Sequence, residues 1–150
     1  QFLMFDPYAT HLEALVNAAL ETPGDILELG CGNYSTPILS AIARHRGNRL
    51  SVKSSCREWA EQFTKFADVE LVDWEIWKPE GKYGLIFLDN EQLTRDRIKW
   101  LPELQQHCDC IVMHDSDAAM SHSHYPEMVK GFKRIKTHNT HTPWTVTLQC

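Results

Sequence analysis

The stretch "GDILELGCGNYSTPIL", residues 24–39, decides how this chain folds. It joins a short apolar run to a turn containing Gly30 and Gly32, followed by Ser, Thr and Pro37, which are typical of a helix start. Glycines between a strand and a helix allow a sharp reversal and let the backbone approach a nucleotide-like ligand. The third glycine of a full glycine-rich turn is missing, so the match to that turn is partial. The stretch predicts a strand, a ligand-binding turn and a helix.

The rest of the chain alternates between strand-like and helix-like segments. Apolar strands are expected at residues 25–30, 49–53, 69–74, 83–90 and 108–117. Helices are expected at residues 7–22, 35–46, 56–66 and 93–107, with Pro102 kinking or restarting the last. Residues 116–126 are interpreted as a polar loop, and 131–138 with 142–150 as a closing β-hairpin. This alternation predicts one α/β domain over residues 1–150, with a mainly parallel sheet covered by helices on both faces.

Composition and charge limit the class of protein, its partners and its cellular compartment. The 150 residues are 43% hydrophobic and 23% charged, and no apolar run is long enough for a membrane span. The net charge of −5 does not favour a nucleic-acid partner, and the basic run at 130–136 is expected to guard a solvent-facing strand. Five cysteines without a CxxC pair, and no signal-peptide pattern at the start, predict a reduced, cytoplasmic protein. Cys108 and Cys110 are expected to be buried structural thiols.

Four motifs occur in a definite order: "ELGCGNYSTPIL", "FLDN", "MHDSD" and "PWT". In this order they resemble the class I S-adenosylmethionine (SAM)-dependent methyltransferases, and more closely a small bacterial or phage subfamily. The resemblance extends from about residue 22 to residue 149. It implies a Rossmann-like methyltransferase domain with a seven-stranded sheet, SAM as cofactor, and methyl transfer to an unidentified acceptor.

The resemblance also implies roles for individual residues. The loop that faces the methionine part of the cofactor corresponds to Glu28, Gly30, Cys31, Gly32 and Asn33. Asp73 and Trp74 match the pair that brackets the adenine, although a loop acid and a core aromatic are the simpler readings. Asp89 matches the polar end of the fourth strand, beside the methyl group. Glu28 could instead only tie down the loop.

Lys53 departs from the pattern of this family. The second strand there commonly ends in an acid that accepts hydrogen bonds from the ribose, whereas lysine has only donors. Three readings stay open. Ser54 or Ser55 could reach the ribose, Lys53 could favour an anion such as the phosphate of NADP, or the site could have lost its cofactor. Glu58 in the next helix is a further acid near this position.

Polar residues at the last strand ends are the candidates for catalysis. Asp89, His114 and Asp115 are predicted to be catalytic, with His114 as a general base. Asp89, Asp115 and Asp117 could also hold a divalent metal, because carboxylates suit magnesium, manganese or calcium. His122 and His124 are interpreted as loop residues.

Methyl transfer to a small molecule or a sugar hydroxyl is the function favoured by these observations. Two alternatives stay open: a non-catalytic relative that binds a nucleotide-like ligand or a partner, and a nucleotide-dependent oxidoreductase. The partner is expected to be a small-molecule acceptor rather than a nucleic acid or a membrane. The five tryptophans include candidates for exposed positions that would allow a homo-oligomer.

Overall fold

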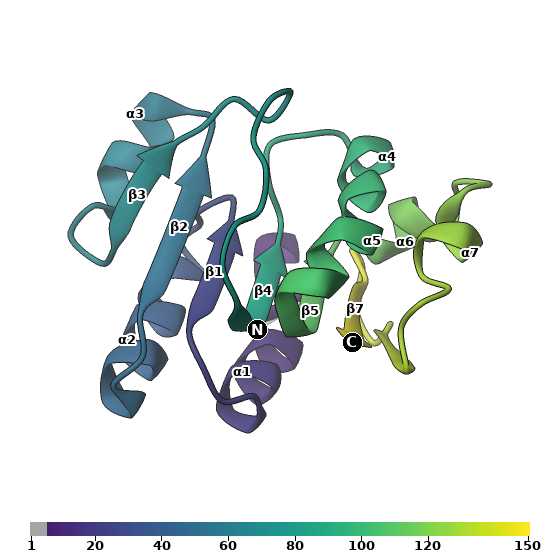
Figure 1. The fold of residues 1–150 in the computed structure, drawn as a ribbon, viewed down its shortest axis with the longest axis horizontal. Coiled ribbons are helices and arrows are strands. Elements are labelled where there is room, and N and C mark those ends of the chain that lie inside the picture. Colours follow the sequence, from purple (N-terminus) through teal and green to yellow (C-terminus); the bar gives the residue numbers. More distant parts are fainter. Residues whose placement is uncertain (1–5) are drawn as a thin grey trace, which may run out of the picture.

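A seven-stranded sheet organises the computed structural model, which describes residues 6–150 (Figure 1). The strand order is β3-β2-β1-β4-β5-β7-β6. The first five strands run parallel, and the last two form an antiparallel hairpin in which β7 pairs with β5. The strands are β1 (Ile26–Leu29), β2 (Leu50–Ser54), β3 (Asp68–Leu71), β4 (Tyr83–Leu88), β5 (Cys108–His114), β6 (Arg134–His138) and β7 (Thr145–Gln149). The predicted mainly parallel sheet with a C-terminal antiparallel hairpin is confirmed.

Helices cover both faces of this sheet. One face carries α1 (Leu12–Glu21), α2 (Thr36–Arg46) and α3 (Arg57–Ala60). The other carries α4 (Thr94–Arg97), α5 (Leu101–Leu104), α6 (Ser116–Met120) and α7 (Tyr125–Met128). Four 3-10 turns complete the helical layers: η1 (Pro7–Ala9), η2 (Glu61–Phe63), η3 (Ile98–Trp100) and η4 (Gln105–His107).

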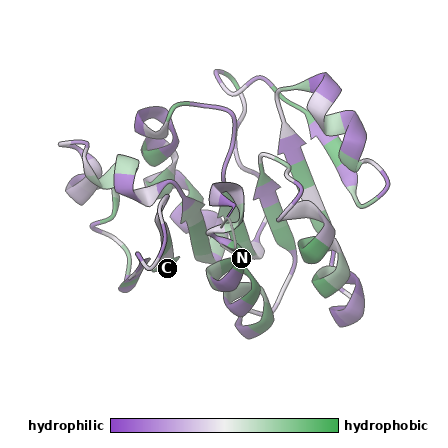
Figure 2. Cartoon of the chain, turned by 180° about the vertical axis from the view of Figure 1, so that it is seen from behind, coloured by the Kyte–Doolittle hydropathy of each residue, from purple (hydrophilic) through white to green (hydrophobic). Residues whose placement is uncertain are grey.

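The core consists of two main layers separated by the sheet. Leu27 and Ile86 face the α4–α7 side, whereas Ile26, Leu85 and Phe87 face α1 and α2. Successive side chains of a strand point to opposite faces, so the central strands are apolar on both sides. Figure 2 shows this as hydrophobic strands between helices with polar outer surfaces. The core therefore fixes the central strands, whose ends carry the polar motifs.

Several predicted segments differ from the structure. The helix expected at 56–66 is α3 followed by η2, and the strand expected at 69–74 ends at Leu71. The helix expected at 7–22 is divided into η1 and α1, because the chain turns at Thr10 and His11 before α1 begins. The polar loop expected at 116–126 contains α6 and α7, so that prediction was wrong for most of its length. Pro102 does restart the helical segment, since it lies in the first turn of α5.

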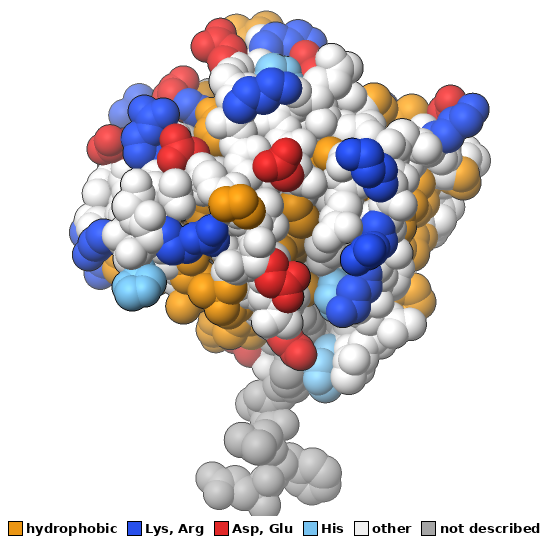
Figure 3. Space-filling model, turned by 60° about the horizontal axis from the view of Figure 1, so that its bottom comes forward, with side chains coloured by type: hydrophobic (Ala, Val, Ile, Leu, Met, Phe, Trp, Pro, Cys, Tyr) orange, Lys and Arg blue, Asp and Glu red, His pale blue; other side chains and the backbone are white. Residues whose placement is uncertain are grey.

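The surface gives three further results. All five tryptophans are buried or half-buried. The prediction that some of them are exposed was therefore wrong. β6 is the edge strand with exposed Arg134 and Lys136, as expected. Figure 3 shows a column of Lys and Arg side chains at the right of the face, and others at its left and top. Within residues 6–150, no helix has both the length and the apolarity that a membrane crossing needs.

Candidate functional site

Three neighbouring strands bring polar side chains to one place at their carboxyl ends. In β1, Glu28 shares a face with Ile26, and Asp89 and His114 continue the same face from β4 and β5. Leu88 is in register with Met113, so Asp89 and His114 come next to each other. β1 and β4 are also where the strand order reverses, which is where open α/β sheets bind ligands.

The glycine turn after β1 is held by backbone hydrogen bonds from both sides. The Gly30 amide donates to the Lys53 carbonyl at 2.8 Å, and the Asp89 amide donates to the Leu29 carbonyl at 2.9 Å. Gly30 has a φ of 91°, and a Cβ there would overlap the backbone carbonyl of Asp89. The Gly32 amide donates to the Thr36 hydroxyl at 3.0 Å. Glycine is therefore required at position 30 by both conformation and space.

A cavity of about 450 Å³ opens above this turn. Its walls come from the glycine turn, the N-terminal segment, α3 and the end of β4. The lining residues are Asp6, Tyr8, His11, Cys31, Gly32, Asn33, Tyr34, Ser35, Trp59 and Asp89. Four of the predicted site residues are among them, namely Cys31, Gly32, Asn33 and Asp89. The Tyr34 hydroxyl donates to Asp6 at 2.6 Å and so joins the turn to the N-terminal segment.

Glu28 is completely buried beneath the turn. Burial raises the pKa of its carboxyl to about 8, against a smaller lowering by the nearby hydroxyls of Ser35 and Thr36. Neither carboxylate oxygen makes a hydrogen bond of normal geometry to a described residue. Glu28 is therefore protonated at neutral pH in this structure, and an approaching cation would favour its ionised form.

Replacing Glu28 with Gln should flatten the pH dependence of stability. In the wild type, the folded state keeps a proton that the unfolded chain loses above pH 4.5, so the free energy of unfolding should fall as pH rises towards 8. Between pH 5 and pH 8 this loss should be roughly 3 kcal/mol larger in the wild type than in Glu28→Gln. Urea unfolding of both proteins at several pH values measures it. Parallel pH profiles would show that Glu28 ionises normally.

Asp89 and Asp115 share one arginine. Nη1 of Arg97 lies 3.0 Å from Asp89 Oδ1 and 2.9 Å from Asp115 Oδ2. Asp117 is engaged elsewhere, since it accepts a hydrogen bond from the Trp144 amide. The possible metal site of Asp89, Asp115 and Asp117 is therefore not formed, because a guanidinium occupies the position between the first two carboxylates.

The backbone of Asp115 supports this pairing. It has a φ of 57°, a left-handed conformation that aspartate tolerates better than most residues. This turn ends β5 and begins α6. It leaves the Asp115 carboxylate beside Arg97 and outside the 450 Å³ cavity.

His114 and His11 stand behind Asp89. His114 Nδ1 is 3.4 Å from Asp89 Oδ2, and Nε2 is 2.9 Å from the Thr10 hydroxyl. The His11 ring packs on Phe87 and edge-on against His114. Burial, with a smaller effect of His114, lowers the pKa of His11 to about 4, so its ring is neutral at pH 7. His11 therefore lines the cavity and His114 lies behind it, although only His114 was predicted.

Lys53 is directed away from the cavity. Its ammonium forms an ion pair with Glu70, which lies directly opposite on β3. The neighbouring Ser54 is fully buried and faces the other side of β2. The ion pair with Glu70 on the neighbouring strand therefore accounts for a lysine at position 53. An anionic ligand would have to compete with Glu70 for this lysine.

Glu91, which sequence reasoning missed, occupies the end of β2. Its carboxylate accepts hydrogen bonds from both Ser54 and Ser55, and Trp74 Nε1 donates to it at 2.7 Å. Trp74 is buried in the core, whereas Asp73 is an exposed loop acid whose side chain accepts from the Glu75 amide. An acid is therefore present at the end of β2, but it comes from the loop after β4.

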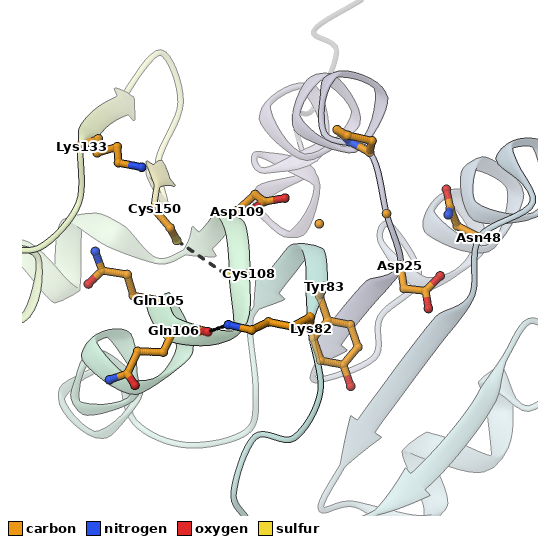
Figure 4. A pocket seen from close by; sticks show the side chains of 13 residues that line it. Asp25, Asn48, Lys82, Tyr83, Gln105, Gln106, Cys108, Asp109, Lys133 and Cys150 are labelled. Atoms are coloured by element: carbon orange, nitrogen blue, oxygen red, sulfur yellow. Dashed lines mark hydrogen bonds between the residues drawn. The ribbon is translucent and has the colours of Figure 1, made fainter.

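A larger cavity lies at the opposite end of the strands, where β4 and β5 begin. It measures about 750 Å³ and is lined by the starts of β4 and β5, including Tyr83 and Cys108 (Figure 4). Cys108 Sγ is 3.7 Å from Cys150 Sγ, and Cys108 and Cys110 are buried as predicted. This cavity is at the amino ends of the strands, so it is not where a parallel sheet of this type binds its cofactor.

Comparison with known proteins gives structural likeness without sequence likeness. No family model matches the chain, and no curated protein is similar to it in sequence. The O-methyltransferase TomG from Streptomyces achromogenes, involved in tomaymycin synthesis and solved with SAM, superposes with a TM-score of 0.65. It is 15% identical, and the match covers 97% of this chain and 81% of TomG.

Two other solved structures give the same result. The N-terminal domain of EvdMO1, solved in the presence of S-adenosylhomocysteine (SAH) and D-fucose, has a TM-score of 0.68 at 13% identity, covering 98% of this chain and 84% of that one. The plantazolicin methyltransferase BpumL, in complex with SAH, has a TM-score of 0.61 at 14% identity, covering 95% and 84%. Likeness at such low identity is a likeness of fold: this chain has the Rossmann-like fold of the SAM-dependent class I methyltransferases.

Proposed function

We propose that this chain transfers a methyl group from SAM to a small-molecule acceptor, with a hydroxyl as the favoured acceptor group. The observation that carries the proposal is the cavity over the glycine turn, at the reversal of strand order in a methyltransferase fold. Solved structures of the same fold contain SAM or SAH. The net charge of −5 favours a small molecule over a nucleic acid. In this proposal the chain acts as one domain in the cytoplasm.

The cofactor would lie along the carboxyl ends of β1, β2 and β4. The glycine turn would face its methionine part, where Glu28 can ionise beside the amino group. In the resembling family an acid stands where this chain has Lys53. Here Glu91 would accept the hydrogen bonds of the ribose hydroxyls, in exchange for those it accepts from Ser55. A carboxylate is suited to this because its two oxygens can accept from both hydroxyls of a diol.

SAM supplies an activated methyl group, and the acceptor oxygen displaces its sulfur in line. The protein's part is to hold the two reactants close and exclude water. Asp89 is the strand-end carboxylate that lines the cavity, and so would orient the acceptor hydroxyl and accept its hydrogen bond. The proton would pass to the Asp89–His114 pair, while Arg97 and Asp115 keep Asp89 in place.

Calorimetry with SAH, SAM and NADP tests this proposal. We expect micromolar binding of SAH and SAM and none of NADP, because Glu70 already neutralises Lys53. Lys53→Glu should change SAH affinity by less than about threefold, although it should lower stability by roughly 0.5–1 kcal/mol by placing like charges opposite each other. Binding of NADP alone would favour an oxidoreductase. A gain of SAH binding only in Lys53→Glu would favour a site that has lost its cofactor.

A further inference from the structure

Two histidine rings and one carboxylate converge beside the 450 Å³ cavity, which His11 and Asp89 line while His114 lies buried behind them. His11, Asp89 and His114 each offer a ligand atom, and the three atoms lie within 4.8 Å of one another. The rings are almost completely buried, with His11 3% and His114 4% exposed. They come from the start of α1 and the ends of β4 and β5, so the fold itself brings them together.

His11 has no well-formed hydrogen bond to a described residue at either ring nitrogen, although the Tyr34 backbone lies close enough to affect its pKa. Neither of its ring nitrogens makes a hydrogen bond of normal geometry to a residue within 6–150, and both are inaccessible. Leaving a buried polar group unpaired costs about 1–3 kcal/mol, and such groups are uncommon unless a ligand or a water satisfies them. His11 also lines the cavity, although its two ring nitrogens are covered.

The hydrogen bonds of His114 point to a cation on its other side. The Thr10 hydroxyl donates to the Pro7 carbonyl at 3.2 Å, so it accepts from Nε2 of His114 at 2.9 Å. In a neutral ring this leaves Nδ1 as a lone pair that faces Asp89 Oδ2 at 3.4 Å. Two acceptors at that distance require a proton or a metal ion between them.

We propose that His11, Asp89 and His114 bind one divalent transition-metal ion of the zinc or iron(II) class, with the remaining coordination positions open to the cavity. Two imidazoles and one carboxylate suit such ions, whereas magnesium and calcium prefer oxygen ligands. Bound at about 2.1 Å from the metal, tetrahedral ligand atoms stand about 3.4 Å apart, close to the observed separation of His114 and Asp89.

The surroundings are compatible with a dication. Arg97 pairs with Oδ1 of Asp89 and leaves Oδ2 available to a metal ion. Arg97, Asp89 and Asp115 together carry a net charge of −1, which favours a cation. Thr10 holds the outer nitrogen of His114, as outer partners of metal-bound histidines usually do. The role of the ion rests on the proposed function: it would bind the acceptor oxygen and lower its pKa, and the proton would then leave to water in the cavity, because Asp89 Oδ2 and His114 Nδ1 would be ligands of the ion and no longer its acceptors.

Metal titration without SAM tests the site directly. Chelator-treated protein is titrated with Zn²⁺ by calorimetry and with Co²⁺ by visible absorption, using wild type, His11→Ala, His11→Gln and His114→Ala. We expect one equivalent bound by the wild type, with Co²⁺ bands of nitrogen and oxygen coordination, and at least about 30-fold weaker binding in each variant. The control carries His122→Ala and His124→Ala, which remove two histidines of the α6–α7 connection, and should bind as the wild type does.

Several results would overturn this site. They are absence of binding by the wild type, equal binding by folded His11 variants, or loss of binding in the control. Circular dichroism establishes folding, and His11→Gln keeps a polar side chain if the alanine variant does not fold. SAH calorimetry in the presence of chelator is a separate readout. Binding of SAH without binding of metal would contradict only the proposed metal site. Binding of metal without binding of SAH would contradict the proposed methyl transfer.

Discussion

Gly30→Ala is expected to abolish SAH binding and to lower the free energy of unfolding by at least about 3 kcal/mol. Two costs add at this position. The φ of 91° is unfavourable for any residue with a Cβ, and the new Cβ would overlap the Asp89 carbonyl and lie 2.7 Å from Cα of Asn90. Because these atoms belong to the backbone at the end of β4, relief would require β1 and β4 to separate. Urea unfolding and SAH calorimetry measure both effects.

Gly47→Ala provides the matched control. Gly47 also has a positive φ, 70°, at the end of α2, but beyond its own chain segment no atom of the described residues lies within 4 Å of the place its Cβ would take. Its cost should be the conformational part alone, about 1–2 kcal/mol, with SAH affinity unchanged. Equal losses of stability in the two variants would mean that the contact between Gly30 and β4 contributes nothing, and SAH binding by Gly30→Ala would remove this turn from the cofactor site.

Glu91→Gln should weaken SAH binding by roughly 10- to 100-fold. The amide keeps the size of the side chain but removes its charge and one of its two acceptor oxygens. Hydrogen bonds to a charged group contribute about 1.5–3 kcal/mol, which corresponds to this range. The effect should appear in calorimetry with SAH and be smaller for methionine-like fragments that lack the ribose.

Glu58→Gln separates the two acids near the end of β2. Glu58 is exposed in the first turn of α3 and is the acid that the sequence offers nearest to Lys53. Its replacement should leave SAH affinity within about twofold of the wild type. The opposite pattern would be a loss of SAH affinity in Glu58→Gln and none in Glu91→Gln. It would mean that α3 binds the ribose and that Glu91 only links its loop to Ser54.

Much of the fold could be predicted because its signals are local. The apolar strand and glycine turn of residues 24–39 lie as expected, and Pro102 restarts a helix as expected. α6 and α7 were missed because helices of five and four residues have no apolar periodicity to detect. They depend on tertiary contacts, such as the hydrogen bond from the Ser116 amide to the Trp144 carbonyl.

The candidate site could be predicted only where a strand end carries it. The positions of Asp89 and His114 could be predicted because the carboxyl ends of parallel strands lie at the same end of the sheet. Arg97, Glu91 and His11 could not be found this way, because each reaches the site from a helix or loop whose position depends on packing. One signal was available: Glu91 follows "LDN" directly after β4, at the same edge as the unexpected Lys53.

The turn between η1 and α1 has a consequence for the order in which the molecule is built. Thr10 and His114 contact each other across 104 positions of sequence. A chain emerging from the ribosome exposes its N-terminal part first, and long-range contacts form only after the intervening loop closes. His11 must therefore wait for β5 to be synthesised before it can be covered. The Thr10–His114 contact can therefore form only after residue 114 has been synthesised, and a nascent chain ending before that residue cannot complete this part of the site.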